Sequence, residues 1–494
     1  MDFYNSCCSI GSCGHTLPNY GIMIRLALVL ALLLTSCGLP TKHHAPNFPL
    51  PECWKWPTSA CEGETICEEQ PEEWWFYFDD PLLHELIGLS LEHNQTLEQA
   101  YHRMREARAM ACSSCSYLWP TLTLDPSITK QESVVQNPLM FGPNQMRFQA
   151  SQYELPLTVS YDVDLWQKYT HQCLAGNARA GASLERLAGT QLLLTTDVAQ
   201  TYYKLRELDT ERQLLEATIV LRKQSVELTR SRFTNGIITR LDVSRAELLQ
   251  AETEADLADI VRQRAIQENA LAVLCGSLPS NFTIWMSPLF DPAPPIPADL
   301  PSDVLQRRPD IAEAERNLAA LYSDIGVSYA SLFPSLHITG QIGYSSPELN
   351  NLLKWQSNMW ALAMNASQTI FDAGRNCANL RAAHARYCQG IANYRQTIMT
   401  AFQEVENALA SIHQNAIGLA ALERQVLAAK DVYTLTHQRY KDGIIISLDV
   451  VDAERVLLDT QRQEVRSRGQ QFLDAVQLVK ALGGSPRCVS MQRN

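Results

Sequence analysis

Residues 232–243 read Arg232-Phe-Thr-Asn-Gly236-Ile-Ile-Thr-Arg-Leu241-Asp242-Val243, and residues 439–450 repeat them as Arg439-Tyr-Lys-Asp-Gly443-Ile-Ile-Ile-Ser-Leu448-Asp449-Val450. The offset of 207 residues then holds without a gap as far as Gly276 and Gly483. A period of this length exceeds any solenoid unit and indicates a duplicated half-molecule. We therefore expect a function that suits a two-fold repeated architecture.

Each copy of the repeat predicts a very long helix that ends at a tight turn. Mostly apolar positions recur every three or four residues from Leu184 to Val226, and the same heptad register returns from Ile391 to Val426, which is typical of coiled coils. If 167–229 and 374–436 are single helices, each is about 95 Å long. Gly236 and Gly443 then supply the flexible residue where one helix reverses into the next.

Four other segments alternate apolar and polar residues, which is typical of strands with two different faces. They are residues 118–129, 153–163, 335–345 and 360–366. Each is long enough to cross a bilayer as a tilted strand, although the edge of a soluble sandwich gives the same alternation. Residues 133–147 and 346–358 lie between the paired strands, and we expect exposed loops there.

The number of strands indicates how the chain assembles. Four strands cannot close a transmembrane barrel, because such barrels begin at about eight strands and lipid does not tolerate open edges. Three copies would supply about twelve strands. We therefore expect a mainly α fold with a membrane β portion: a homotrimer with a 12-stranded β-barrel that continues into a long coiled-coil barrel.

The N-terminal region predicts export. Ile24-Arg25 leads into nine apolar residues, 26–34, which are too few to span a bilayer and are typical of a secretory signal. Leu34-Thr-Ser-Cys37 resembles a bacterial lipobox. We expect a covalent lipid at Cys37, with an ordinary cleaved signal as the alternative.

Composition excludes several classes of protein. The net charge of −12 and the absence of long basic runs argue against nucleic acid as a partner. The chain has neither a phosphate-binding glycine loop nor a nucleophile elbow, so we expect no enzyme activity and no cofactor. Cys112 and Cys115 have metal-like spacing, but nothing completes a zinc set, and a local disulfide or free thiols are expected. Three more cysteines fall in a segment rich in proline and glutamate, where an oxidising compartment permits a disulfide: Cys53, Cys61 and Cys67.

Motifs between and within the repeats resemble those of a known family. They are Leu300-Pro-Ser-Asp303-Val-Leu-Gln-Arg307-Arg308-Pro309-Asp310-Ile311, Ala314-Glu315, Ile325-Gly326-Val327 and Phe333-Pro334-Ser335, besides the two Gly-x(5)-Asp-Val turns. The chain resembles the outer membrane factor (TolC-like) family, and within it the NodT-like lipoprotein branch. The resemblance implies an outer membrane location in a Gram-negative-type bacterium, a periplasmic helical tunnel, and transport driven by an inner membrane pump through a periplasmic adaptor. From the residues alone, Arg307 and Arg308 are expected to bind acidic neighbours and stabilise the fold.

The second turn carries the candidate gate. Asp452 lies one helical turn beyond Asp449 on the same face, so a trimer would place six carboxylates around its axis. The resemblance implies that Asp449 and Asp452 match the family's acidic rings at the periplasmic entrance, and that Tyr440 and Asp242 match residues that tie neighbouring coils in the closed state. Ile445 stands where the family's second turn can carry an arginine, which puts a salt-bridge latch in doubt. The alternative role for the aspartates is to cap helix N-termini.

These observations predict a passive exit duct for small toxic compounds in a tripartite efflux system. Two alternatives remain: an exit duct for a type I protein secretion system, and a structural envelope lipoprotein that transports nothing. The expected organisation is a signal peptide over 1–36 (or from Met23), a lipid-anchored segment over 37–80, a first repeat over 81–276, a proline-rich linker over 277–302, a second repeat over 303–484 and a tail over 485–494.

Overall fold

The structure, a computed structural model, describes residues 51, 54–56, 73–136, 145–289, 292–296, 307–442 and 444–484. The expected signal peptide and tail lie outside the described residues, as do Cys37, Cys53, Cys61, Cys67, Leu300 and Asp303. Gly443, the expected tip of the second turn, also lies outside them. The chain divides into two compact units. The described part of the first, the sheet unit, falls within 115–172 and 323–382, and the second, the helical unit, comprises 44–114, 173–322 and 383–494.

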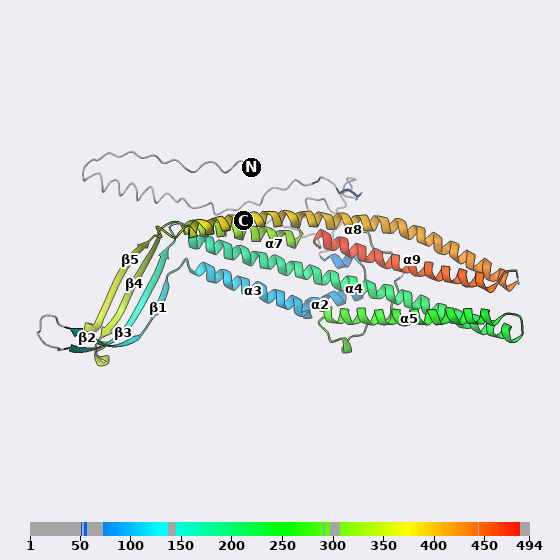
Figure 1. Ribbon diagram of the computed structural model, residues 1–494, viewed down its shortest axis with the longest axis horizontal. Coiled ribbons are helices and arrows are strands. Elements are labelled where there is room, and N and C mark those ends of the chain that lie inside the picture. The colour runs from blue at the N-terminus through cyan, green and yellow to red at the C-terminus, as the bar shows by residue number, and fades with distance from the viewer. Residues whose placement is uncertain are drawn as a thin grey trace. The chain divides into compact units, whose positions relative to one another are not determined.

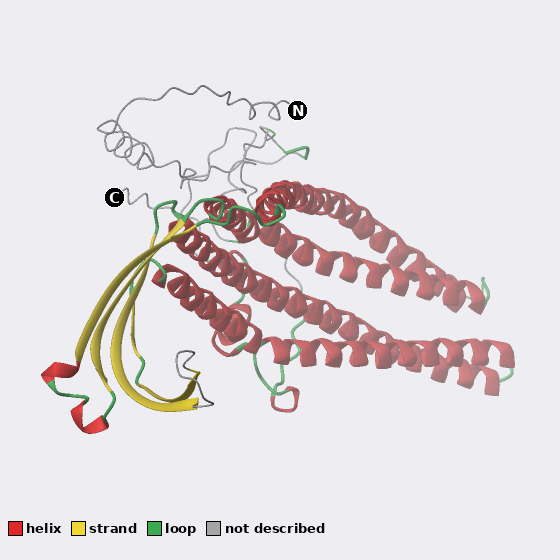
Figure 2. Cartoon of the chain, turned by 60° about the vertical axis from the view of Figure 1, so that its left-hand side comes forward, coloured by secondary structure: helices red, strands yellow, loops and turns green. Residues whose placement is uncertain are grey.

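The sheet unit is a single antiparallel sheet (Figure 2). Its strands are β1(Thr121–Leu124), β2(Ser127–Gln136), β3(Gln145–Val163), β4(Ser335–Ser346) and β5(Asn358–Ser367). The order is β1-β3-β4-β5, and β2 also pairs with β3. Because β1 pairs with residues 157–160 of β3 and β2 pairs with residues 145–154, these two strands occupy one strand position in succession. Each chain therefore provides four strand positions, the number that the alternating segments predicted.

Two predicted boundaries in the sheet need correction. The expected strand over 118–129 is interrupted at Asp125-Pro126, because proline has no backbone N–H to donate to a ladder. The expected loop over 133–147 is wrong at both ends, since the pairing of β2 with β3 continues to Gln136 and Gln145; residues 137–144 lie outside the described residues. The expected loop over 346–358 is confirmed, and it contains two short 3₁₀ helices, η4(Leu349–Asn351) and η5(Trp355–Ser357).

One face of the sheet at strand β5 is apolar and uncovered within a single chain. Trp360, Leu362 and Met364 alternate along β5 and are 78%, 73% and 66% exposed. Leu122 and Leu124 on β1 are also exposed. Contiguous exposed apolar surface of this kind marks contact with an apolar surrounding or with another chain.

Each repeat contains one very long helix followed by a shorter one, at corresponding places in the sequence (Figure 1). Helices α4(Lys168–Thr234) and α8(Arg375–Lys441) contain 67 residues each, which corresponds to about 100 Å at about 1.5 Å per residue. They are followed by α5(Arg240–Leu274) and α9(Ser447–Leu482). The first residues of α8 and α9 lie 207 positions after those of α4 and α5. The predicted long helices are confirmed, and each continues five residues beyond its predicted end.

Shorter helices complete the chain. They are η2(Trp74–Tyr77), α2(Pro81–His93), α3(Gln95–Ser116), η3(Pro279–Asn281) and α7(Pro309–Ala330). The aromatic side chains of Trp74, Phe78, Tyr203 and Phe472 form the centre of the largest apolar core, which joins η2 to α4 and α9. In the described ranges, no helix has the length and apolar character needed to cross a membrane.

Arg308 binds the partners that the sequence led us to expect. Its guanidinium donates to Asp310 and to Glu404, both at 2.7 Å, and to the backbone carbonyl of Ala481 at 2.7 Å. These contacts join the start of α7 to α8 and to the end of α9. The expectation that Arg308 stabilises the fold is therefore confirmed.

The two cysteines on α3, Cys112 and Cys115, differ in their oxidation state. Cys112 is an exposed free thiol, whereas Cys115 is disulfide-bonded. A local disulfide between these two residues is therefore wrong. On a helix, positions three apart have Cβ atoms about 5–6 Å apart, which is farther than a disulfide allows.

Candidate functional site

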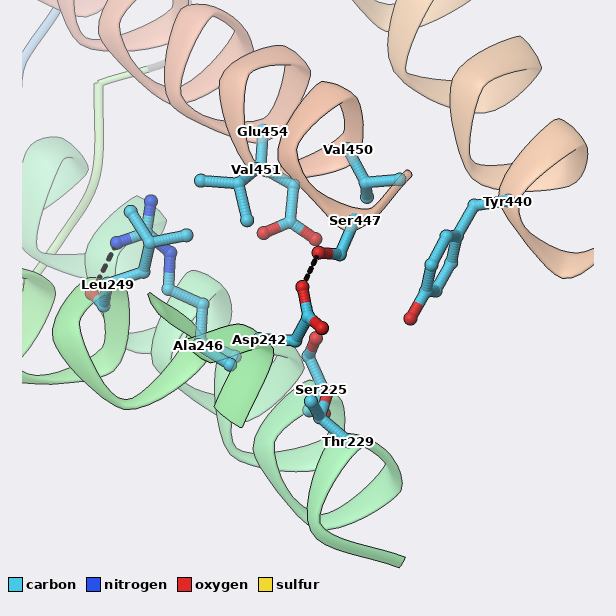
Figure 3. Close-up of a pocket in the computed structure, with 11 residues that line it drawn as sticks. Ser225, Thr229, Asp242, Ala246, Leu249, Tyr440, Ser447, Val450, Val451 and Glu454 are labelled. Atoms are coloured by element: carbon cyan, nitrogen blue, oxygen red, sulfur yellow. Dashed lines mark hydrogen bonds between the residues drawn. The ribbon is translucent and has the colours of Figure 1, made fainter. Parts of the chain in front are cut away.

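A small cavity lies between the two helical hairpins, close to their turns (Figure 3). Its volume is about 40 Å³. All four long helices of the two hairpins contribute residues to its wall: Arg222, Ser225 and Thr229 on α4, Asp242, Ala246 and Leu249 on α5, Tyr440 on α8, and Ser447, Val450, Val451 and Glu454 on α9. The cavity thus brings together two residues of the predicted gate, Asp242 and Tyr440.

The first turn reverses the chain through Gly236. This residue has φ +74°, a left-handed conformation that favours glycine. The backbone nitrogens of Gly236 and Ile237 donate to the carbonyls of Phe233 and Arg232, both at 2.9 Å. The last carbonyls of α4 are satisfied in this way, as expected for a helix that ends at glycine.

Asp242 stabilises the start of α5 and also reaches the second hairpin. Its carboxylate accepts hydrogen bonds from the backbone nitrogen of Thr239 at 3.1 Å and from the Thr239 hydroxyl at 2.7 Å. The Ser447 hydroxyl on α9 donates to the other carboxylate oxygen. These hydrogen bonds, that of Ser447 most of all, hold the pKa of Asp242 below its usual value. Asp242 is therefore a capping residue and a contact between hairpins at once.

The second turn has the same backbone reversal but different side chains. Ile444 donates to the carbonyl of Arg439 at 2.9 Å, as Ile237 does to Arg232 in the first turn. The N-cap of α9 is Ile446, which has no polar side chain, whereas Thr239 lies before α5. Capping by a side chain is thus a property of the first turn.

Asp449 and Asp452 are exposed on the first two turns of α9. Neither carboxylate forms a hydrogen bond or an ion pair with any residue that the structure describes. In the first repeat the corresponding positions hold Asp242 and Arg245, and Arg245 contributes to the lowered pKa of Asp242. The first turn therefore balances its charge, while the second presents two free carboxylates.

Within a single chain, Tyr440 forms no hydrogen bond with Asp242, and its predicted role in tying neighbouring coils of the assembly stays a prediction. The guanidinium of Arg232 lies over its ring, 5.1 Å from the centroid. Within the described part of the chain its hydroxyl makes no hydrogen bond, and Ser447 occupies the place at the Asp242 carboxylate. Two contacts therefore join the hairpins at this level: the Ser447–Asp242 hydrogen bond and the packing of Arg232 over Tyr440.

Several residues of the site were not predicted. Thr239 could have been found, because Thr239-x-x-Asp242 before an apolar run is a capping-box pattern. Ser447, Arg222 and Glu454 carried no such signal, since nothing in a single sequence states which face of one hairpin meets the other.

A charged network joins the hairpins farther from the turns. Arg462 on α9 donates to Glu211 on α4 and to Asp256 on α5, both at 2.7 Å. Arg466 also binds Glu211, which is 1% exposed. Leu215, Ile260 and Leu458 pack beside this network. Ion pairs and apolar contacts therefore join the two hairpins at this level.

The described residues contain no group of three histidine, cysteine or acidic side chains that could hold a metal ion. The cavity is also far smaller than the sites of about 300–1,000 Å³ that hold small-molecule ligands. The chemistry at the turns is that of charges and hydrogen bonds between helices.

Comparisons with known proteins all match this chain, over nearly its whole length, to outer membrane channel and efflux proteins. The family model described as outer membrane efflux protein matches residues 86–277 and 300–484. The solvent efflux pump outer membrane protein SrpC of Pseudomonas putida is 32% identical, over 93% of this chain and 97% of its own. The outer membrane protein OprJ of Pseudomonas aeruginosa is 30% identical, over 94% and 96%. The open state of the MtrE outer membrane channel of Neisseria gonorrhoeae superposes with a TM-score of 0.77 at 28% identity, over 91% of this chain and 98% of that one.

Proposed function

This chain belongs to the outer membrane efflux protein family and is an outer membrane exit duct, and we propose that it serves a tripartite system that expels small toxic compounds. In this proposal, an inner membrane pump supplies the energy, and a periplasmic adaptor connects the pump to the turns of the two hairpins. The relative SrpC is named as part of a solvent efflux pump, which supports small compounds as the cargo. Deleting the gene should make cells sensitive to solvents and dyes, and unchanged tolerance together with loss of a secreted protein would favour protein secretion instead.

The duct is proposed to be a homotrimer. A single chain provides four strand positions, with open edges at β1/β2 and at β5. Unpaired backbone groups are not tolerated in lipid, and twelve strands from three copies would close. The purified protein should be trimeric in detergent by light scattering; a monodisperse monomer that retains its strand content would contradict this assembly.

Asp449 and Asp452 are proposed to form the gate. The proposal is supported by the difference from Asp242: the carboxylates of Asp449 and Asp452 are exposed and form no hydrogen bond with a described residue, so the fold does not require them. In a trimer they would form stacked acidic rings, which attract cations. The double change Asp449→Ala and Asp452→Ala should raise conductance in planar bilayers and weaken block by multivalent cations from the periplasmic side.

The duplication offers a matched control for this experiment. Arg245→Ala alters the position that corresponds to Asp452 but removes a positive charge from the first hairpin. It should leave cation block as strong as in the wild type. Unchanged conductance and block in a folded Asp449/Asp452 double variant would remove the gate assignment and leave the duct itself standing.

The lipid anchor at Cys37 is a separate proposal, supported by the sequence Leu34-Thr-Ser-Cys37. Metabolic labelling with a fatty acid should mark the wild type and not Cys37→Ser, and label retained in the variant would contradict acylation at this residue. Channel activity should survive the change, because a closed barrel can itself hold the protein in the membrane.

A further inference from the structure

Arg222 carries a buried positive charge that no carboxylate contacts. It is 5% exposed and lies in the wall of the cavity between the hairpins. One of its terminal nitrogens donates to the carbonyl of Leu249 at 2.5 Å and to the hydroxyl of Thr253, both on α5. Its Nε has no hydrogen-bond partner among the described residues. A buried charge that lacks an ionic partner is costly to keep.

Glu454 carries a negative charge in the wall of the same cavity, on the second hairpin. No described residue forms a hydrogen bond or an ion pair with its carboxylate. Burial raises its pKa above the usual value, and the nearby charge of Arg222 offsets this only in part. Burial likewise lowers the pKa of Arg222. Both charges are therefore less favourable here than in water.

The repeat shows that this situation is peculiar to the second hairpin. Glu247, which corresponds to Glu454, accepts hydrogen bonds from Arg230 at 2.7 and 3.1 Å within its own hairpin. The residue that corresponds to Arg230 is His437, whose Nδ1 is buried without a hydrogen bond to any described residue. Glu454 has thus lost the partner that Glu247 has.

The cavity can relieve these charges only slightly. Its volume of about 40 Å³ has room for one to three waters, since one water needs at least about 10–15 Å³. The hydroxyls of Ser225 and Thr229 also line it. A few trapped waters hydrate an ion far less well than bulk solvent does.

From this geometry we infer that Arg222 and Glu454 are further gating residues, whose poorly compensated charges weaken the contact between the two hairpins and so favour their separation. Separation would open the cavity to solvent and hydrate both groups. The inference rests on the proposed gate, because it requires that the hairpins move apart near their turns. It assigns to this pair the opposite role from the Ser447–Asp242 contact, which holds the hairpins together.

The direction of the pH dependence follows from linkage. Glu454 binds a proton more tightly while the hairpins are in contact, so lowering the pH favours contact, and raising the pH through the elevated pKa favours separation. Each unit of pKa difference between the two states corresponds to a factor of about ten in their ratio per protomer. The titratable groups near the pair are Asp242, Glu252 and Asp256 on α5, Tyr433, His437 and Tyr440 on α8, and Asp459 on α9.

Glu454→Gln tests the inference, because it keeps the shape of the side chain and removes its charge. In planar bilayers the open occupancy of the full-length wild type should rise several-fold when a pH titration begun in the acidic range passes upward through the raised pKa of Glu454. Glu454→Gln should remain at the low occupancy throughout. Glu247→Gln is the matched control, since it removes the corresponding charge from the first hairpin, and it should keep the wild-type profile.

Two results would overturn the inference. If Glu454→Gln retained the wild-type profile, its charge would not act on the hairpins; if it opened more readily, the pair would be an attractive clasp. Hydrogen exchange over residues 447–458 gives a second readout that needs no conductance: protection in Glu454→Gln should exceed that in Glu247→Gln at the same pH, and equal protection would also overturn the inference. The Asp449/Asp452 variant, measured beside them, reports separately on the proposed gate.

Discussion

The two hairpin turns share the backbone hydrogen bond that closes them, from Ile237 to Arg232 and from Ile444 to Arg439, and differ in their side-chain contacts. In the first, Thr239 and Asp242 complete a capping box at the start of α5, and Arg230 pairs with Glu247. In the second, Ile446 precedes α9, Asp449 has no hydrogen bond to a described residue, and Glu454 faces a cavity. The first turn is therefore stabilised by its own residues, whereas the second retains charges that its stability does not require. Such charges are available for a function.

The largest effect on this comparison is expected from Asp242→Ala. The change removes both hydrogen bonds to Thr239 and the contact from Ser447. Loss of a cap together with a contact between helices should cost about 2 kcal/mol of local stability. Hydrogen exchange of the first turn of α5 would measure the cost, and a change below about 0.5 kcal/mol would show that the capping box contributes little.

Ile446→Thr should bring the second turn closer to the first. Threonine at the N-cap, with Asp449 at the third helical position, recreates the arrangement of Thr239 and Asp242, and should stabilise the start of α9 by about 1 kcal/mol. Ile446→Val is the control, because it has the same branched shape without a hydroxyl. Equal exchange protection in the two variants would mean that the missing cap is not what distinguishes the turns.

Asp449→Ala should have a smaller effect than Asp242→Ala. Since the Asp449 carboxylate forms no hydrogen bond to a described residue, only its favourable interaction with the helix N-terminus is lost, at about 0.3 kcal/mol. The same exchange measurement applies to the first turn of α9. A loss as large as that of Asp242→Ala would return Asp449 to a capping role and weaken its assignment to the gate.

Tyr440→Phe should have the smallest effect. Phenylalanine keeps the ring beneath Arg232, and the hydroxyl that is lost has no hydrogen bond within the described residues. Conductance and exchange at the turns should match the wild type. Loosening comparable to that of Asp242→Ala would reveal a Tyr440–Asp242 bond in the assembled trimer.

The sequence predicted the parts of the fold that depend on local pattern. The 207-residue offset and the heptads located α4 and α8 within a few residues, because periodic burial extends over the whole length of each helix. The pattern failed at Asp125-Pro126, where the proline interrupts a strand, and at both ends of 133–147, where the pairing continues through residues that do not alternate, such as Val134-Val135. Pairing between backbones does not require the alternation from which strands are recognised.

The candidate site was predicted only in part, for a different reason. Gly236 lies in the first turn, and Asp449 and Asp452 follow the second. The sequence repeat predicted both turns. Arg222 lies within the predicted helix 167–229 and Glu454 aligns with Glu247, yet neither position reveals that the two side chains line one cavity. The proximity of these two side chains depends on how the two hairpins pack against each other, and the periodicity of a single sequence does not predict that packing.

The pairing of β3 with β4 joins the two repeats in one sheet, with Leu157 opposite Ile342. Each repeat contributes two strand positions, so an ancestor with one repeat would have needed six identical copies to supply twelve strands. Every tip of such a hexamer would have carried the same residues. In one chain that holds two copies this constraint is absent, so one tip can carry a threonine cap while the other carries isoleucine and a second aspartate. The difference between Thr239 and Ile446 is thus one that a ring of six identical repeats could not contain.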